Sequence, residues 1–436
     1  MKHFGLSISL LLLGGFISSI SSQELESRLK FYKPDKFRAA VHSLQQKYKT
    51  TYQPVKGWEE AIEELESNRI VLIDGIRKGD KKTIRQAEGL LHTLDATLLA
   101  NPLIQKKQIT AIRRTLGDKA RTAIRGDLGI VPNNFHNNFA IPHPSKGWTN
   151  EFVSLSITPG NIQKKMLFKP AEGVIISDPE PHFNGEKLMY SSIGTNNRWH
   201  LFELNLKEGT SRQLTPEAYR DIDSFDGCYA PDGSYIFCST GTFLGLPCTD
   251  GGSRMCGLFR YDPGTGKTRQ LTFDQDSNWG PVVMENGQIL YQRWEYADIP
   301  HSNSRIMFTM NPDGTNQRAY YGSNSYFPTS YFDARPIPGR PSAMAGIVTG
   351  HHSIPRSGRL ILIDTNQGRQ EADGVICEIP FSGRKVQAEV RDRQADGCWP
   401  RFLHPWPLND TYFLVAMKAA PNSLWGIYLV DTFDNI

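Results

Sequence analysis

The sequence predicts a mainly β protein, an incomplete six-bladed β-propeller preceded by an N-terminal α-helical bundle. Two observations carry this prediction. Apolar residues recur with a helical period of 3.6 in residues 23–125, and beyond residue 150 the pattern changes to short alternating strands separated by turns. The letters RQLT close a strand unit at residues 212–215 and again at residues 269–272. The spacing between these two RQLT endings fits a four-stranded propeller blade that carries an insertion.

The first 22 residues have the three parts of a signal peptide. Lys2 and His3 give a positive start, residues 4–17 form an apolar run, and residues 18–22 are mostly small. We therefore expect an exported protein, periplasmic or extracellular, with no transmembrane span after signal cleavage. The alternative is an uncleaved membrane anchor, for which the apolar run is short.

Residues 23–125 are predicted to form a helical domain. Apolar residues recur at helical spacing in residues 35–50, 58–76 and 81–100, and Pro102 can open a fourth helix that runs to about residue 125. Short connections between such helices favour a small antiparallel bundle. The glutamates at positions 59, 60, 63, 64 and 66 are interpreted as a solvated face. Residues 126–150, rich in Pro and Asn, are predicted to be a linker.

Residues 151–436 are predicted to form the propeller, with about five blades. Repeated strand and turn units favour radial repetition over the alternative of an open antiparallel sandwich. The stretches 151–157 and 165–168 look like the last two strands of a blade that lacks its first two. The final unit stops after its third strand. We therefore expect a truncated chain, in which about three strands of a six-bladed ring are missing at the C-terminal closure.

Charge and cysteine content exclude two classes of function. A formal net charge of +4 in 436 residues gives no reason to expect a nucleic-acid partner. The six cysteines include no CxxC pair, which excludes covalent c-type haem. An exported chain permits disulfides, and we expect one between Cys248 and Cys256. Cys228 and Cys398 both follow Asp-Gly on what we interpret as inner strands of distant blades, too far apart to bridge.

Several strand motifs resemble a known family. The stretch Asp178-Pro-Glu-Pro-His-Phe and the RQLT endings resemble TolB-like propellers. Three more specific stretches, Leu271-Thr-Phe-Asp-Gln-Asp, Ala334-Arg-Pro-Ile-Pro-Gly and Leu424-Trp-Gly-Ile-Tyr-Leu-Val-Asp, resemble the middle domain of the hydrazine synthase alpha subunit. The resemblance covers about residues 128–436 and implies a propeller fold and an exported location. It does not carry hydrazine synthesis to this chain, because the CxxCH haem-attachment motifs are absent.

Candidate site residues gather in connections expected at one end of the propeller, the funnel mouth. Imidazole and carboxylate groups are suitable ligands for zinc, copper or iron. The predicted metal ligands are His301, His351 and His352. The predicted ligand-binding residues are Glu295, Asp298, Trp279, Trp399 and Asp226. The alternative is that these groups hydrogen-bond loop backbones. We interpret His404 as structural.

Two functions remain open at this point. The first is a binding or scaffolding module of a larger exported protein, with a protein or a small molecule as its ligand. The second is a metal- or haem-dependent redox enzyme with its site at the funnel mouth. Catalytic residues are not assigned, because the sequence contains no GxSxG, HExxH or phosphate-binding loop.

Overall fold

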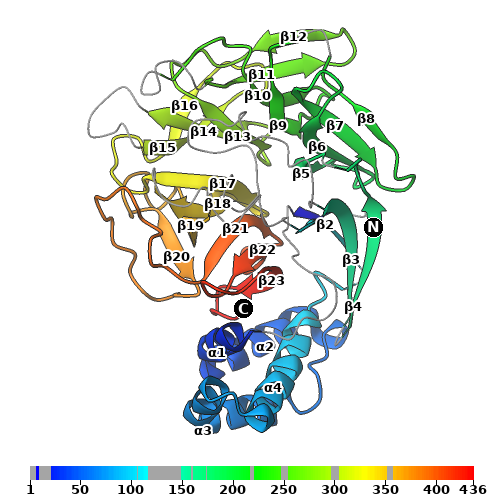
Figure 1. The fold of residues 1–436 in the computed structure, drawn as a ribbon. Coiled ribbons are helices and arrows are strands. Elements are labelled where there is room, and N and C mark those ends of the chain that lie inside the picture. Colours follow the sequence, from blue (N-terminus) through cyan, green and yellow to red (C-terminus); the bar gives the residue numbers. More distant parts are fainter. Residues whose placement is uncertain are drawn as a thin grey trace.

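The described part of the chain is mainly β, with several sheets and four α-helices. The computed structural model describes residues 6–8, 21–105, 107–115, 149–158, 161–172, 174–216, 220–246, 254–295, 304–350 and 357–436. Figure 1 shows the sheets arranged around a common centre, with the helices at one side. Among the described strands no sheet closes on itself. The prediction of a mainly β fold with N-terminal helices is therefore confirmed, and the number of blades stays a prediction.

The helices are α1 (Ser22–Phe31), α2 (Pro34–Tyr48), α3 (Trp58–Arg77) and α4 (Lys81–Leu99). Helices α2, α3 and α4 match the three expected apolar patterns. Helix α1 was not expected. Its N-cap is Ser21, whose hydroxyl accepts a hydrogen bond from the Glu24 backbone N–H at 3.1 Å. The acidic side chains at the start of α3 are mostly exposed, as expected of a solvated face.

The expected fourth helix is wrong over residues 108–115, which form strand β2 (Gln108–Thr115). This strand pairs along its full length with β3 (Thr149–Thr158), and β3 pairs with β4 (Asn161–Phe168). Ile109 and Ala111 are fully buried. Isoleucine and threonine favour strands, and the open edge of β3 supplies the hydrogen bonds that decide between the two structures. A short strand β1 (Leu6–Ile8) lies parallel to β2.

The next sheets repeat one antiparallel order, in which each strand pairs with its neighbour along the chain. Their strands are β5 (Ile176–Pro181), β6 (Lys187–Ile193), β7 (Trp199–Asn205), β8 (Ser211–Gln213), β9 (Ser224–Tyr229), β10 (Tyr235–Ser239), β11 (Gly257–Asp262) and β12 (Lys267–Gln270). Two further sets are β13 (Asn278–Val283), β14 (Ile289–Glu295), β15 (Ser304–Met310), β16 (Arg318–Tyr321), β17 (Ser330–Ile337), β18 (Arg340–Thr349), β19 (Arg359–Asp364) and β20 (Val375–Ile379). One residue pair, Arg305 with Ser330, links these two sets into a single sheet.

The last sheet has three strands, β21 (Arg401–Pro407), β22 (Tyr412–Lys418) and β23 (Trp425–Asp431). No fourth strand pairs with this sheet among the described residues, and the expected truncation stays a prediction. Helix α1 lies against the sheet: the Tyr428 hydroxyl donates to Glu24 at 2.8 Å, and the Ser27 hydroxyl donates to the Ala419 carbonyl at 3.2 Å.

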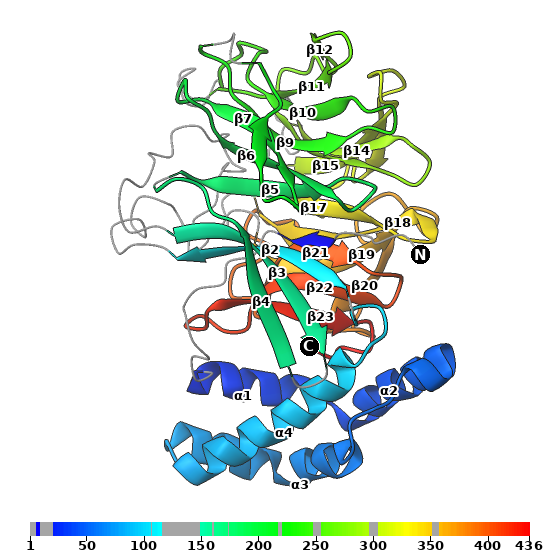
Figure 2. The same ribbon diagram turned by 90° about the vertical axis from the view of Figure 1, so that its right-hand side faces the viewer.

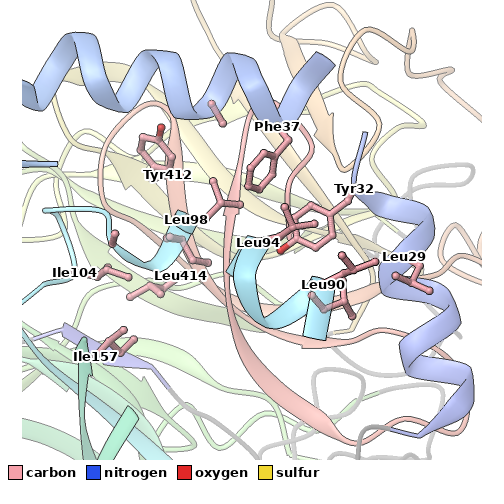
Figure 3. Packing of buried hydrophobic residues seen from close by; sticks show 14 of the residues in the cluster. Leu29, Tyr32, Phe37, Leu90, Leu94, Leu98, Ile104, Ile157, Tyr412 and Leu414 are labelled. Carbon is pink, nitrogen blue, oxygen red and sulfur yellow. The ribbon is translucent and has the colours of Figure 1, made fainter. Parts of the chain in front are cut away.

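The helices share one hydrophobic core with two of the sheets. Side views place the helices as a layer directly below the sheets that contain β3 and β22 (Figure 2). Figure 3 shows Leu94 and Leu98 of α4 packing towards Leu414 of β22, with Ile157 of β3 nearby. These side chains are at most 6% exposed. The helical segment is therefore continuous with the β core. No described helix is long and apolar enough to cross a lipid bilayer.

Candidate functional site

A small polar cavity lies where five strands, β5, β9, β13, β17 and β21, meet. Its ionisable lining residues are Asp178, Glu180, Asp226, Asp333, Arg335 and His404. The cavity has a volume of about 50 Å³. That is room for a few water molecules, whereas pockets for organic ligands usually measure about 300–1,000 Å³.

The same backbone irregularity builds this lining in every one of the five strands. The pairing of β5, β9, β13, β17 and β21 with the next strand shows an equivalent register shift, and β17 has a second shift further along. The residue at each equivalent shift has a positive φ: Asp178 (49°), Asp226 (48°), Gly280 (58°), Asp333 (52°) and His404 (46°). Asp, Gly and His tolerate this left-handed region better than other residues do. Each bulge re-aims the chain towards the centre of the molecule.

An ion pair between Glu180 of β5 and Arg335 of β17 crosses the cavity, with 2.6 Å between oxygen and nitrogen. The Arg335 guanidinium also lies over the Trp406 ring, 4.9 Å from its centroid. Enclosure by protein lowers the pKa of Arg335, but the carboxylates of Glu180, Asp333 and Asp226 outweigh it and the net shift is upward. Arg335 therefore keeps its positive charge, and its side chain is held between β5, β17 and β21.

His404 of β21 pairs with Asp333 of β17. Its Nδ1 lies 3.2 Å from Asp333 Oδ2, and the His404 backbone N–H donates to the same oxygen at 3.3 Å. We had interpreted His404 as a structural residue near an inner strand. The structure places it on the inner strand β21 and in the lining of the cavity, where its ring faces a carboxylate.

A second buried cation comes from β2. The Arg114 side chain is 2% exposed and donates to the Ile176 carbonyl of β5. Burial lowers the pKa of Arg114 to about 10, partly offset by the nearby Asp178 carboxylate. The cavity thus combines four carboxylates with the Arg335 guanidinium and an imidazole, and Arg114 lies outside this lining, near Asp178. Sequence reasoning found only Asp226 and His404 of this set.

Four of the five predicted ligand-binding residues are described, and they occupy different elements. Asp226 lies in the cavity. Trp279 is 1% exposed and stacks on Trp294, with ring centroids 6.1 Å apart. Glu295 ends β14 and pairs with Arg293 at 3.0 Å.

Trp399 lies just before β21 and is partly exposed. The Arg401 guanidinium is 4.9 Å from the centre of its ring. The fifth residue, Asp298, lies outside the described residues.

The predicted metal ligands His301, His351 and His352 also lie outside the described residues. Within the described ranges, no group of three or more His, Cys, Asp or Glu side chains is arranged to hold a metal ion. A metal at the funnel mouth therefore stays a prediction.

The expected disulfide is not seen. Cys256 is a free, buried thiol that donates to the Asn278 carbonyl at 3.3 Å, and Cys238 donates to the same oxygen at 3.6 Å. The Cys256 side chain packs into a hydrophobic core. Its expected partner Cys248 lies outside the described residues. Cys228 lies within β9, but Cys398 precedes β21, so the two positions are not equivalent. Both are free thiols.

Solved structures with some likeness to this chain have low sequence identity. The Kuenenia stuttgartiensis hydrazine synthase has a TM-score of 0.48 and 15% identity over 64% of this chain and 40% of that one. TolB from Acinetobacter baumannii has a TM-score of 0.39 and 13% identity, over 66% and 60%. An oligogalacturonate lyase in complex with manganese has a TM-score of 0.39 and 12% identity, over 65% and 73%.

The chain thus spans about two fifths of the hydrazine synthase chain and three fifths of the TolB chain. No protein-family model matches the chain, and no curated protein does.

Proposed function

We propose that this chain is an exported binding and scaffolding module built as a β-propeller, similar to the middle domain of the hydrazine synthase alpha subunit. In this proposal the sheet of β1–β4 is the sixth blade, and the sheet of β21–β23 lacks its outer strand. The five matching bulges in the first strands support the proposal, because radial repetition places equivalent residues around one axis.

One observation carries the binding role: exposed large apolar side chains concentrate at one end of the sheets. In an antiparallel sheet the second and fourth strands run in the same direction, so the connections after them leave from the same end. Six of the exposed residues lie in such connections, namely Phe243, Leu244, Phe273, Tyr326, Val390 and Leu424. Exposed apolar groups that gather in this way are typical of interaction sites.

The predicted metal ligands belong, by their sequence position, to connections of the same kind. The connections after β14 and β18, which contain His301 and His351, are second-strand connections of this kind. The central cavity is a weaker candidate for a ligand, because its volume is small and its main charged groups already pair with one another. We therefore assign ligand or partner binding to the end of the sheets from which the connections after the second and fourth strands leave, here called the loop end.

The helices complete the scaffold. They share a core with β22 and β3, so the loop end is held by one continuous packed body. Packed interiors transmit position rigidly, which suits a module that presents a surface to a partner.

Metal analysis and an absorption spectrum of the purified full chain test the binding role. A binding module should carry no stoichiometric transition metal and show no absorption band in the visible range. A stoichiometric metal that is lost in the His301→Ala/His351→Ala variant would overturn the proposal in favour of a redox enzyme.

Export is tested separately by the mass of the protein recovered from the periplasm or medium. Signal cleavage predicts a chain that starts near residue 23. Cleavage would also remove β1 and leave β2 as the inner strand of its sheet. Recovery of the full-length mass in the cytoplasm alone would contradict export.

A further inference from the structure

The loop end of the β9–β12 sheet carries the most exposed aromatic side chains at that end of the molecule. Phe243 is 70% exposed and Phe273 is 77% exposed, with Leu244 at 41%. Phe243 and Leu244 belong to the connection between β10 and β11. Phe273 follows β12. A phenylalanine ring gains free energy when it leaves water, so two such exposed rings need an explanation.

The two connections run side by side. A Cβ placed on Gly257 would lie 2.9 Å from Thr242 and 3.2 Å from Thr272. Both threonines therefore converge on the same point of β11. Phe243 and Phe273 directly follow these threonines, so Phe243, Leu244 and Phe273 start from neighbouring points of the surface and are here called the apolar tip.

Phe243 has an energetically unfavourable backbone conformation. Its φ is 56°, a left-handed conformation that is rare for a bulky residue. The turn is fixed by hydrogen bonds from the Thr242 hydroxyl to the Met255 carbonyl (3.2 Å) and from the Met255 N–H to the Leu244 carbonyl (2.9 Å). Strain that the surrounding structure maintains is common at functional sites.

Arginines lie next to the apolar tip. Arg254 pairs with Gly245 as an isolated β-bridge, and its guanidinium donates to the Asp221 carbonyl. The Arg198 guanidinium donates to the carbonyl of Arg220, which is exposed.

The acidic groups in this neighbourhood offset only part of this charge. Asp223 is 2% exposed and pairs with Arg198 at 3.4 Å. Asp221 is exposed. Asp274, which follows Phe273, is half-buried and pairs with Arg293 at 2.9 Å. The surface beside the tip therefore presents the exposed Arg220 and the half-buried Arg254 against the exposed carboxylate of Asp221.

We propose that the apolar tip, with Arg220 and Arg254, docks the protein on an anionic lipid surface. Apolar side chains that enter the interfacial region, together with guanidinium groups that bind phosphates, are the combination that attaches proteins to such surfaces. The tip is well placed for this contact, because the β9–β12 sheet lies at the opposite end of the molecule from the helices in both views (Figures 1 and 2). The proposal goes beyond the binding role above, and it does not depend on whether a metal binds.

Co-sedimentation of the full chain with vesicles tests the proposal. Binding is expected to vesicles of equal parts phosphatidylcholine and phosphatidylglycerol, and to be weaker for phosphatidylcholine alone. The Phe243→Ala/Phe273→Ala variant should bind about tenfold more weakly or worse, because each ring contributes at least a kcal-scale transfer free energy. Arg220→Gln/Arg254→Gln should lower binding severalfold and reduce its salt dependence.

The matched control is Ile70→Ala/Val71→Ala. These side chains of α3 are 79% and 66% exposed and lie on the helices, so their loss removes a similar apolar surface from the opposite end. The control should bind vesicles as the unchanged protein does. Its melting temperature and that of the tip variant should also be unchanged, since exposed substitutions rarely alter stability by more than about 0.5 kcal/mol.

A reporter variant locates the contact. Phe243→Trp should show a blue-shifted emission with anionic vesicles and quenching by brominated lipid chains. The absence of binding to anionic vesicles would overturn the proposal and assign the tip to a protein contact. Equal binding by the Phe243→Ala/Phe273→Ala variant would overturn it as well.

Discussion

The β9–β12 sheet and the β21–β23 sheet end their third strands with the same turn, but in opposite environments. Asp262 is the last residue of β11, and its carboxylate accepts the Gly264 N–H at 2.8 Å. Asp431 is the last residue of β23, and its carboxylate accepts the Phe433 N–H at 3.0 Å. The first turn leads through solvent into β12. The second lies against α2, where Lys36 binds Asp434, and no fourth strand follows among the described residues.

This difference shows how the surroundings of a turn set the ionisation of its aspartate. In the complete sheet the backbone turn holds an exposed carboxylate, and the N–H of Gly264 lowers the pKa of Asp262. In the three-stranded sheet burial raises the pKa of Asp431 to about 7, although Asn435 donates hydrogen bonds that act in the opposite direction. In sequence the two turns share only their leading aspartate, and the surroundings of that aspartate decide the direction of its pKa shift.

Truncation of the shared core should have the largest effect. Leu94→Ala in α4 removes a fully buried side chain and should cost about 2–5 kcal/mol in the free energy of unfolding. Denaturant unfolding followed by helical circular dichroism and by tryptophan fluorescence should give coincident transitions, because helices and sheets share this core.

Leu258→Ala in β11 is the matched control. It is equally buried and should cost a similar free energy, but in a core that contains no helix. A separate, earlier helical transition in Leu94→Ala would show that the helices fold independently of the sheets.

The buried carboxylate should make stability depend on pH. Asp431 has a folded pKa of about 7 against a reference value of 3.8. Because the folded pKa is raised, the stabilisation that Asp431 gives to the folded state is fully present below about pH 4. It is lost as the pH rises through 7. The loss amounts to at most about 4 kcal/mol. Asp431→Asn should flatten this part of the stability profile, whereas Asp262→Asn should leave it in place.

The contact between α1 and the last sheet should have an intermediate effect. Arg28 binds Asp95 of α4 at 2.6 Å, and its guanidinium lies 5.7 Å from the ring centre of Tyr428 in β23. Arg28→Ala should cost roughly 2–3 kcal/mol, because it leaves a partly buried carboxylate without its cation. A double-mutant cycle with Asp95→Ala measures the coupling, and a coupling near zero would contradict a structural role for the pair.

A helix cap should have the smallest effect. The Asp80 carboxylate accepts the N–H groups of Lys82 (3.3 Å) and Thr83 (3.1 Å) at the start of α4. Asp80→Ala should therefore cost about 1 kcal/mol. Urea unfolding should show the whole molecule destabilised by this amount, and Asp80→Asn should recover most of the loss.

Local patterns allowed much of the fold to be predicted. Alternating apolar residues located the strands from β5 onward, including the three-stranded final sheet. Residues 108–115 were misjudged because their structure depends on pairing with β3, which lies more than thirty positions further along the chain. Tertiary pairing overrides local propensity in such cases. Helix α1 was missed because its pattern follows directly on the apolar start of the chain.

The cavity could not be predicted, because its residues come from five strands far apart in the sequence. A signal existed nevertheless. The dipeptides at the bulges are Asp-Pro, Asp-Gly, Gly-Pro, Asp-Ala and His-Pro, each near the middle of a first strand. Aligning the units on these dipeptides, instead of on the RQLT endings, would have brought Asp178, Asp226, Asp333 and His404 together.

The five bulges also limit how this sequence can vary. A left-handed backbone accepts Gly, Asn, Asp and His, and it strongly disfavours β-branched residues. Descendants of this chain should therefore exchange these few residue types at positions 178, 226, 280, 333 and 404 and exclude valine, isoleucine and threonine. A drift towards glycine would keep the backbone and remove charge from the axis of the molecule, so that the shape of the centre and its polarity can evolve separately.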